Sequence, residues 1–137
     1  MNRLNKTEIW PKIELLLEKP KHHDGVMLCR ADFEEAMKDA SDFAYIEIKN
    51  VAFPDLLEKL RKELATLPMK SVRNSVVKIG TTSTGGDGVL TVAKLRSLLE
   101  TIQQFTSGAN LIWGYDRDSA ISSECYSVAV IFAMLTQ

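Results

Sequence analysis

The sequence is poor in cysteine and histidine and has no long hydrophobic run, and these absences exclude several classes of protein. Its two cysteines, Cys29 and Cys125, are far apart and lie in apolar surroundings. We therefore expect packed, reduced thiols and no disulfide framework. The N-terminus lacks the uninterrupted apolar segment of a signal peptide, and no stretch approaches the ~18 apolar residues of a membrane span. These features predict a cytoplasmic protein with no membrane partner.

An excess of charge of one sign is lacking as well. The 17 basic and 18 acidic residues are spread along the chain and give a formal net charge of −1. No basic stripe is present, so the electrostatic footprint of a nucleic-acid-binding protein is missing. We therefore predict no nucleic-acid partner.

Candidate metal ligands and nucleophiles are few. His22, His23 and Asp24 are adjacent, so their side chains diverge, and no further ligand follows at a helical offset. We expect a solvated loop at this place and no metal site. No Ser/His/Asp or Cys/His arrangement stands out, and we assign no catalytic residue.

With 137 residues, the chain is long enough to bury its own core as one domain. Apolar periodicity predicts an N-terminal helix from a Thr7 cap to about Lys19, and a polar loop follows. Asp32 and Glu35 have the spacing of a capping box. We expect Asp32 to be the N-cap of a second helix over 33–39, with Glu35 completing the box.

The remaining elements follow from β-branched runs, helix breakers and one long apolar stripe. We expect strands over 43–49, 75–79, 110–115 and 124–134, and helices over 54–67 and 92–105, the latter capped by Thr91. Both faces of the last strand are apolar, so it is predicted to be central in its sheet. We also expect a hairpin loop over 116–123, and Trp10 and Trp113 as buried anchors.

The Gly-rich segment 81–88 links a predicted strand to a predicted helix, which is where phosphate-binding loops occur. A P-loop needs Lys followed by Ser or Thr after its second Gly, whereas Asp87 follows Gly86 here. The carboxylate of Asp87 would repel a phosphate group. The segment therefore predicts an ordinary loop, no nucleotide site and no cofactor.

Four stretches resemble the C-terminal domain of the bacterial tubulin homologue FtsZ. They are Ala31-Asp32-Phe33, Leu90-Thr91-Val92, Ala109 to Gly114, and Glu124 to Ala133. The order and spacing of the expected elements match that domain over about residues 26–133. The resemblance implies an α/β (α+β) fold, with a mixed four-stranded sheet backed by helices in an FtsZ C-terminal-domain-like unit over 26–137. An N-terminal helix and loop over 1–25 would precede it.

In the FtsZ family this domain lends acidic side chains to the GTP site of a neighbouring subunit, from a loop that reads N-x-D-F-A-D. Asp32 and Phe33 match that motif, Glu35 is a conservative replacement, and Arg30 stands in place of the Asn. The resemblance makes Arg30, Asp32 and Glu35 the candidates for an inter-subunit loop. Carboxylates there position the attacking water, and an Arg can pair with phosphate oxygens. The alternative is that Asp32 and Glu35 only cap a helix.

The sequence contains nothing that resembles the GTP-binding half of FtsZ. The resemblance thus implies a non-catalytic, protein-interaction module of a bacterial cell-division system, which docks on an FtsZ-like filament subunit and caps or modulates filaments. Two alternatives remain open. One is half of a split GTPase whose nucleotide domain is a separate chain. The other is a repurposed scaffold that associates with itself or binds a small ligand.

Overall fold

The computed structural model describes residues 2–17, 25–66, 72–82, 90–106, 109–118, 121–122 and 124–134. In chain order the elements are β1 (Asn2–Asn5), α1 (Lys6–Leu16), α2 (Arg30–Met37), β2 (Asp42–Ala52), α3 (Phe53–Leu64), β3 (Val72–Thr82), α4 (Val92–Phe105), β4 (Asn110–Asp118) and β5 (Cys125–Met134). The expected loop at His22-His23-Asp24 and most of the Gly-rich segment, residues 83–88, lie outside the described residues.

The strands form one mixed sheet in the order β1-β2-β5-β3-β4. β3 and β4 are parallel, and the other neighbouring pairs are antiparallel. The central place predicted for the last strand is confirmed, because β5 lies between β2 and β3. The expected number of four strands is wrong, since the sheet has five. The added strand, β1, has Leu4 as its one apolar residue, so it carries no alternation that could reveal it.

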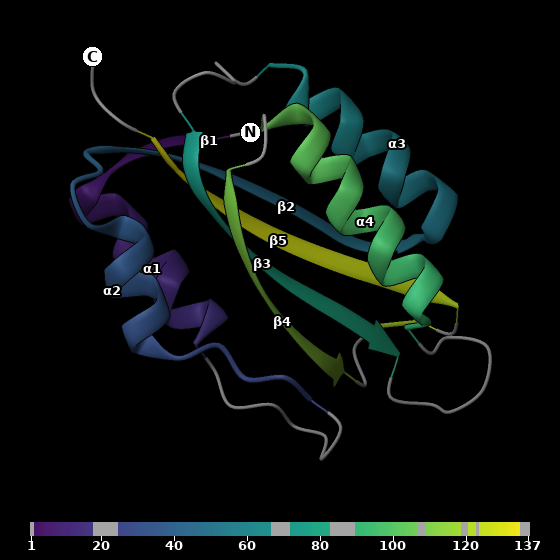
Figure 1. The fold of residues 1–137 in the computed structure, drawn as a ribbon. Coiled ribbons are helices and arrows are strands. Elements are labelled where there is room, and N and C mark those ends of the chain that lie inside the picture. The colour runs from purple at the N-terminus through teal and green to yellow at the C-terminus, as the bar shows by residue number, and fades with distance from the viewer. Residues whose placement is uncertain are drawn as a thin grey trace.

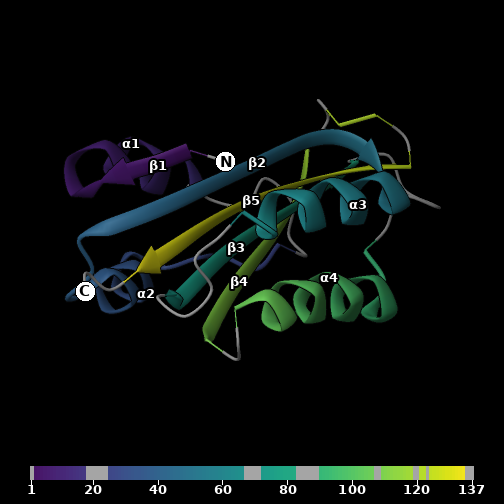
Figure 2. The same ribbon diagram turned by 90° about the horizontal axis from the view of Figure 1, so that it is seen from above.

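Helices cover both faces of the sheet, with α3 and α4 on one face and α1 and α2 on the other (Figures 1 and 2). The core under α3 and α4 contains Leu60 and Phe132, and the core under α1 and α2 contains Ile13, Phe33 and Ile131. β5 contributes side chains to both cores. Its two apolar faces therefore follow from burial on both sides, and the predicted α/β architecture is confirmed.

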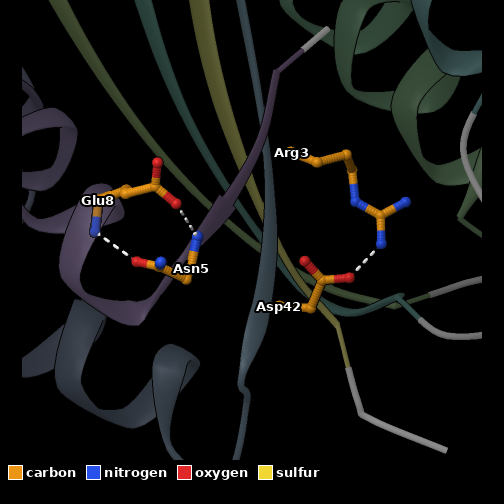
Figure 3. Close-up of polar contacts among 4 residues, drawn as sticks. All are labelled: Arg3, Asn5, Glu8 and Asp42. Atoms are coloured by element: carbon orange, nitrogen blue, oxygen red, sulfur yellow. Dashed lines mark hydrogen bonds and ion pairs between the residues drawn. The ribbon is translucent and has the colours of Figure 1, made fainter.

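The N-terminal helix α1 begins one residue after a cap at Asn5, and not at the expected Thr7. The Asn5 side chain accepts hydrogen bonds from the backbone N–H groups of Thr7 (3.0 Å) and Glu8 (2.8 Å), and the Glu8 carboxylate accepts one from the Asn5 N–H (3.0 Å; Figure 3). This capping box fixes the turn from β1 into α1. An ion pair between Arg3 and Asp42 joins β1 to the start of β2 (Figure 3).

The two long helices on the other face follow their sequence signals closely. α4 has the predicted bounds, and its cap is confirmed, because the Thr91 side chain accepts a hydrogen bond from the Lys94 N–H at 3.1 Å. α3 has Pro54 in its first turn and buries Leu56, Leu60 and Leu64. It ends at Leu64, earlier than the expected Leu67.

The expected hairpin over 116–123 is wrong. β3 separates β4 from β5 in the sheet, so the connection has to cross β3 and cannot be a tight turn. Ile121 lies against Gly80 of β3. Ser122 and Asn50 of β2 exchange hydrogen bonds at 2.7 and 3.2 Å. The strand order, with β3 between β5 and β4, imposes this crossing.

Two expectations about burial are also wrong. Cys29 is exposed and Cys125 is partly exposed, although both are free thiols as expected. Trp10 is 38% exposed, whereas Trp113 packs at the margin of the core under α3 and α4. Trp10 is exposed because it lies outside the buried face of α1, which is formed by Ile9, Ile13 and Leu16.

Candidate interaction surface at the start of helix α2

The segment that leads into α2 is fastened to the sheet edge at β4. The Val26 N–H donates to the Tyr115 carbonyl at 2.8 Å, and the Tyr115 N–H donates to the Val26 carbonyl at 2.9 Å. A Cβ on Gly114 would lie 2.8 Å from the Val26 carbonyl oxygen and 2.7 Å from Leu28 Cγ. Glycine at position 114 therefore lets the segment cross β4 in contact with its backbone. The sequence did not reveal this anchorage.

Asp32 is not the N-cap of α2. The helix begins at Arg30 with Cys29 as its N-cap residue, which places Asp32 at the third helical position. From there its carboxylate accepts a hydrogen bond from the Cys29 N–H at 3.3 Å. Asp32 thus fills the return half of a capping box, and the helix starts three residues earlier than its acidic spacing indicated. Glu35 lies one turn later, is exposed and has no place in the box.

Phe33, the second residue that matches the FtsZ motif, has a structural role in this chain. Its side chain is fully buried and belongs to the core between the sheet and α1 and α2. The position thus anchors α2 to the sheet.

Arg30 is held by the neighbouring helix α1. Its guanidinium donates to Glu14 Oε1 at 2.7 Å and lies 5.9 Å from the centre of the Trp10 ring. The hydrogen bond and the charge of Glu14 raise the pKa of Arg30 above its ordinary value, so Arg30 is always a cation. The Arg30 and Glu14 side chains are each about half exposed, so the pair adds little stability. Sequence reasoning missed Trp10 and Glu14, although their i,i+4 spacing places them on one face of α1.

The structure therefore places the three sequence candidates on the same short helix, α2, but in different surroundings. Arg30 and Glu35 are exposed, and Asp32 is partly buried in its cap. We use the name α1–α2 surface for these three residues of α2 together with Trp10 and Glu14 of α1. In the described part of the chain no three His, Cys, Asp or Glu side chains come together as a metal site. The exposed part of this surface presents charges of both signs and one partly exposed aromatic ring.

Replacing Asp32 by alanine is expected to lower the free energy of unfolding by about 1 kcal/mol, as loss of a helix cap usually does. Glu35→Ala is the matched control and should change it by less than about 0.5 kcal/mol, as exposed substitutions do. Urea unfolding followed by circular dichroism measures both. An equal or larger loss in Glu35→Ala would contradict the assignment of the box to Cys29 and Asp32.

The sequence matches no protein-family model and no curated protein. Its fold, however, is similar to solved structures of FtsZ and TubZ. The FtsZ dimer of M. jannaschii matches over 81% of the chain with a TM-score of 0.57 and 15% identity. The chain has the fold of the FtsZ/tubulin C-terminal domain.

TubZ shares that fold over more of the chain. TubZ-Bt in its four-stranded filament matches over 93% of the chain, with a TM-score of 0.65 and 13% identity. TubZ of Bacillus thuringiensis serovar israelensis, in its GDP-form protofilaments, matches over 91% with a TM-score of 0.62 and 12% identity. At these identities the likeness is one of fold.

The chain spans about a third of the length of these proteins: 32% of the FtsZ chain and 32–33% of the TubZ chains. The resemblance seen in the sequence is thus confirmed at the level of the C-terminal domain fold. Among the helices in the described ranges, none is long and apolar enough to cross a membrane.

Proposed function

We propose that the chain is a non-catalytic interaction module that docks on FtsZ- or TubZ-type filament subunits and caps or modulates their filaments in the bacterial cytoplasm, as part of cell division or a related filament system. The observation that carries this proposal is the match to about one third of the FtsZ and TubZ chains, over nearly the whole of this chain. A subunit that shares one filament contact and lacks the other can add to one filament end and stop growth there.

The α1–α2 surface supports the same proposal. It includes the residues whose sequence resembles the FtsZ inter-subunit loop, and Arg30 and Glu35 hold charges that a partner can reach. The Arg30 guanidinium is already oriented by Glu14 and Trp10, so less side-chain entropy is lost on docking. The positive charge of Arg30 and the negative charge of Glu35 would set the orientation of a docked partner.

Co-sedimentation with the FtsZ- or TubZ-type protein of the same cell tests the docking. The chain should pellet with polymers, and Glu35→Lys should weaken its binding at least several-fold, because a charge at the contact is reversed. Glu100→Lys is the matched control, since Glu100 is an exposed residue of α4 on the opposite face of the sheet. No pelleting of the wild-type chain at stoichiometric protein would overturn the proposal, and equal loss in both variants would place the contact elsewhere.

A split GTPase is the second candidate, and the geometry of Asp32 argues against it. A water-positioning carboxylate needs its oxygens free for the neighbouring nucleotide, whereas one oxygen of Asp32 bonds the Cys29 N–H. If the chain did complete a GTPase, Asp32→Ala would abolish the activity of the mixture with its partner. We expect no such activity to depend on Asp32.

The melting temperature of the chain alone is expected to be the same with and without millimolar GTP and Mg²⁺. Tight nucleotide binding needs several backbone N–H groups on the phosphates, a cation and a base pocket, and the sequence offers Asp87 where a P-loop has Lys. A ligand at about a hundred times its dissociation constant would add ~2.7 kcal/mol, which a melting curve shows easily. A GTP-dependent rise in melting temperature would contradict the non-catalytic proposal.

A further inference from the structure

The edge of the sheet at β2 is only partly covered. β2 spans Asp42–Ala52, but β1 pairs only with its first residues, from Asn2 opposite Tyr45 to Asn5 opposite Asp42. Figure 2 shows β1 alongside the first part of β2 only. Within the described ranges no strand pairs with the outer side of 46–52. Backbone donors and acceptors of a free edge are a ready template for another strand.

A shallow groove of about 320 Å³ lies at this open edge. It is lined by Glu47, Ile48 and Lys49 of β2 and by Lys59, Lys62 and Glu63 of α3. The charges of both signs are mixed, so the groove matches neither a strongly acidic nor a strongly basic peptide. A surface of balanced charge can instead complement a second copy of itself.

The charges on β2 have the spacing that self-pairing requires. In an antiparallel pair of β2 strands centred on Ile48, Glu47 of each copy lies opposite Lys49 of the other. Opposite charges at directly facing positions stabilise a sheet, and like charges destabilise it. The groups are already arranged at the edge, because Lys49 Nζ is 3.2 Å from Glu47 Oε1 and the Tyr45 hydroxyl donates to Glu47 Oε2 at 2.5 Å.

Glu47 is also kept ionised. Burial raises the pKa of its carboxyl group, but the hydrogen bond from Tyr45 and the positive charges of Lys49 and Lys12 outweigh that effect and lower it. The Glu47 carboxylate therefore remains charged at neutral pH, as pairing with a facing lysine requires.

We propose that two copies of the chain associate through antiparallel pairing of β2 over Ile46–Asn50, which joins their sheets into one. β1 sets one limit of the contact, because it occupies the edge of β2 from Asp42 to Tyr45. Asn50 sets the other, because it has a positive φ of 56° and its N–H turns inward to Ser127 Oγ at 3.0 Å. The contact is short, so the association is weak and depends on concentration.

This pairing is independent of the proposed docking on filaments. It uses the outer edge of β2, whereas docking uses the α1–α2 surface. A failure of either test therefore leaves the other proposal untouched.

Sedimentation equilibrium of the full chain tests the pairing by charge exchange. The weight-average mass of the wild type should rise toward two chains as the concentration approaches about 1 mM. Lys49→Glu should remain monomeric, because Glu47 then faces a glutamate, and Glu47→Lys together with Lys49→Glu should restore association. Lys38→Glu makes the same charge change at an exposed residue of another face and should behave as the wild type. A wild type that stays monomeric, or a Lys49→Glu variant that associates equally, would overturn the proposal.

Disulfide trapping gives the register directly. In a chain with Cys29→Ser and Cys125→Ser, the pair Glu47→Cys and Lys49→Cys should form covalent dimers under mild oxidation. Two cysteines at i and i+2 of one strand are too far apart to bond within a copy. Each single replacement is the control, and cross-linking no greater in the double variant than in the singles would contradict the register centred on Ile48.

Discussion

Replacing Phe33 by alanine is expected to lower the free energy of unfolding by about 3–5 kcal/mol, the range for loss of a large buried aromatic side chain. Phe33 is fully buried in the core shared by α1, α2 and the sheet. Its loss leaves a cavity where several elements meet, so α2 should detach from the sheet more easily. For a domain of this size such a loss is a large part of the total stability.

Chemical denaturation followed by circular dichroism measures this effect. Glu34→Ala is the matched control, because Glu34 is the next residue of the same helix and is exposed. Its effect should stay within about 0.5 kcal/mol. A Phe33→Ala protein of nearly unchanged stability would mean that Phe33 serves an interface and does not anchor α2.

Replacing Gly114 by valine is expected to lower the free energy of unfolding by about 3 kcal/mol, near the upper end of the range for forcing extra atoms into a packed site. The first added carbon would lie 2.8 Å from the Val26 carbonyl oxygen, a backbone atom that cannot rotate away. The segment leading to α2 would then move off β4 and lose both hydrogen bonds between Val26 and Tyr115.

Hydrogen exchange should report the same change locally, as faster exchange of the Val26 amide. Gly80→Ala is the control, because the atom met there at 2.9 Å is the end of the Ile121 side chain, which can turn aside. Gly80→Ala should lower the free energy of unfolding by about 1 kcal/mol or less. Equal losses at the two glycines would show that the crossing over β4 is not tightly packed.

The elements that sequence reasoning predicted well are those whose signal is local. α4 has an apolar stripe and a capping threonine, and its bounds agree with the structure. β5 is apolar on both faces, and its central place follows from that pattern alone. Periodicity and capping chemistry act over one or two turns, so a sequence displays them directly.

What the sequence did not predict depends on contacts between distant residues. β1 is too short and polar to show a pattern, and it is a strand because β2 offers it an edge. The predicted hairpin is absent because β4 and β5, although consecutive in the sequence, are separated by β3 in the sheet.

The candidate site shows the same limit. The motif indicates the candidate residues Arg30, Asp32 and Glu35, but it does not indicate what surrounds them. Asp32 is the third residue of α2 and not its N-cap, because the helix starts three residues earlier than the acidic spacing predicts. The partners of Arg30, Glu14 and Trp10, come from α1. No local pattern connects them across the intervening residues.

The proposed capping of filaments is tested most directly by light scattering during polymerisation of the FtsZ- or TubZ-type protein of the same cell. Capping acts on filament ends. The steady-state scattering should therefore fall even when the chain is present in far fewer copies than the filament subunits. Glu35→Lys should restore it, while Glu100→Lys should inhibit like the wild type. Scattering that is unchanged even at one chain per subunit would contradict the proposed interaction. A decrease that appears only at equal amounts would mean that the chain binds free subunits and does not cap filament ends.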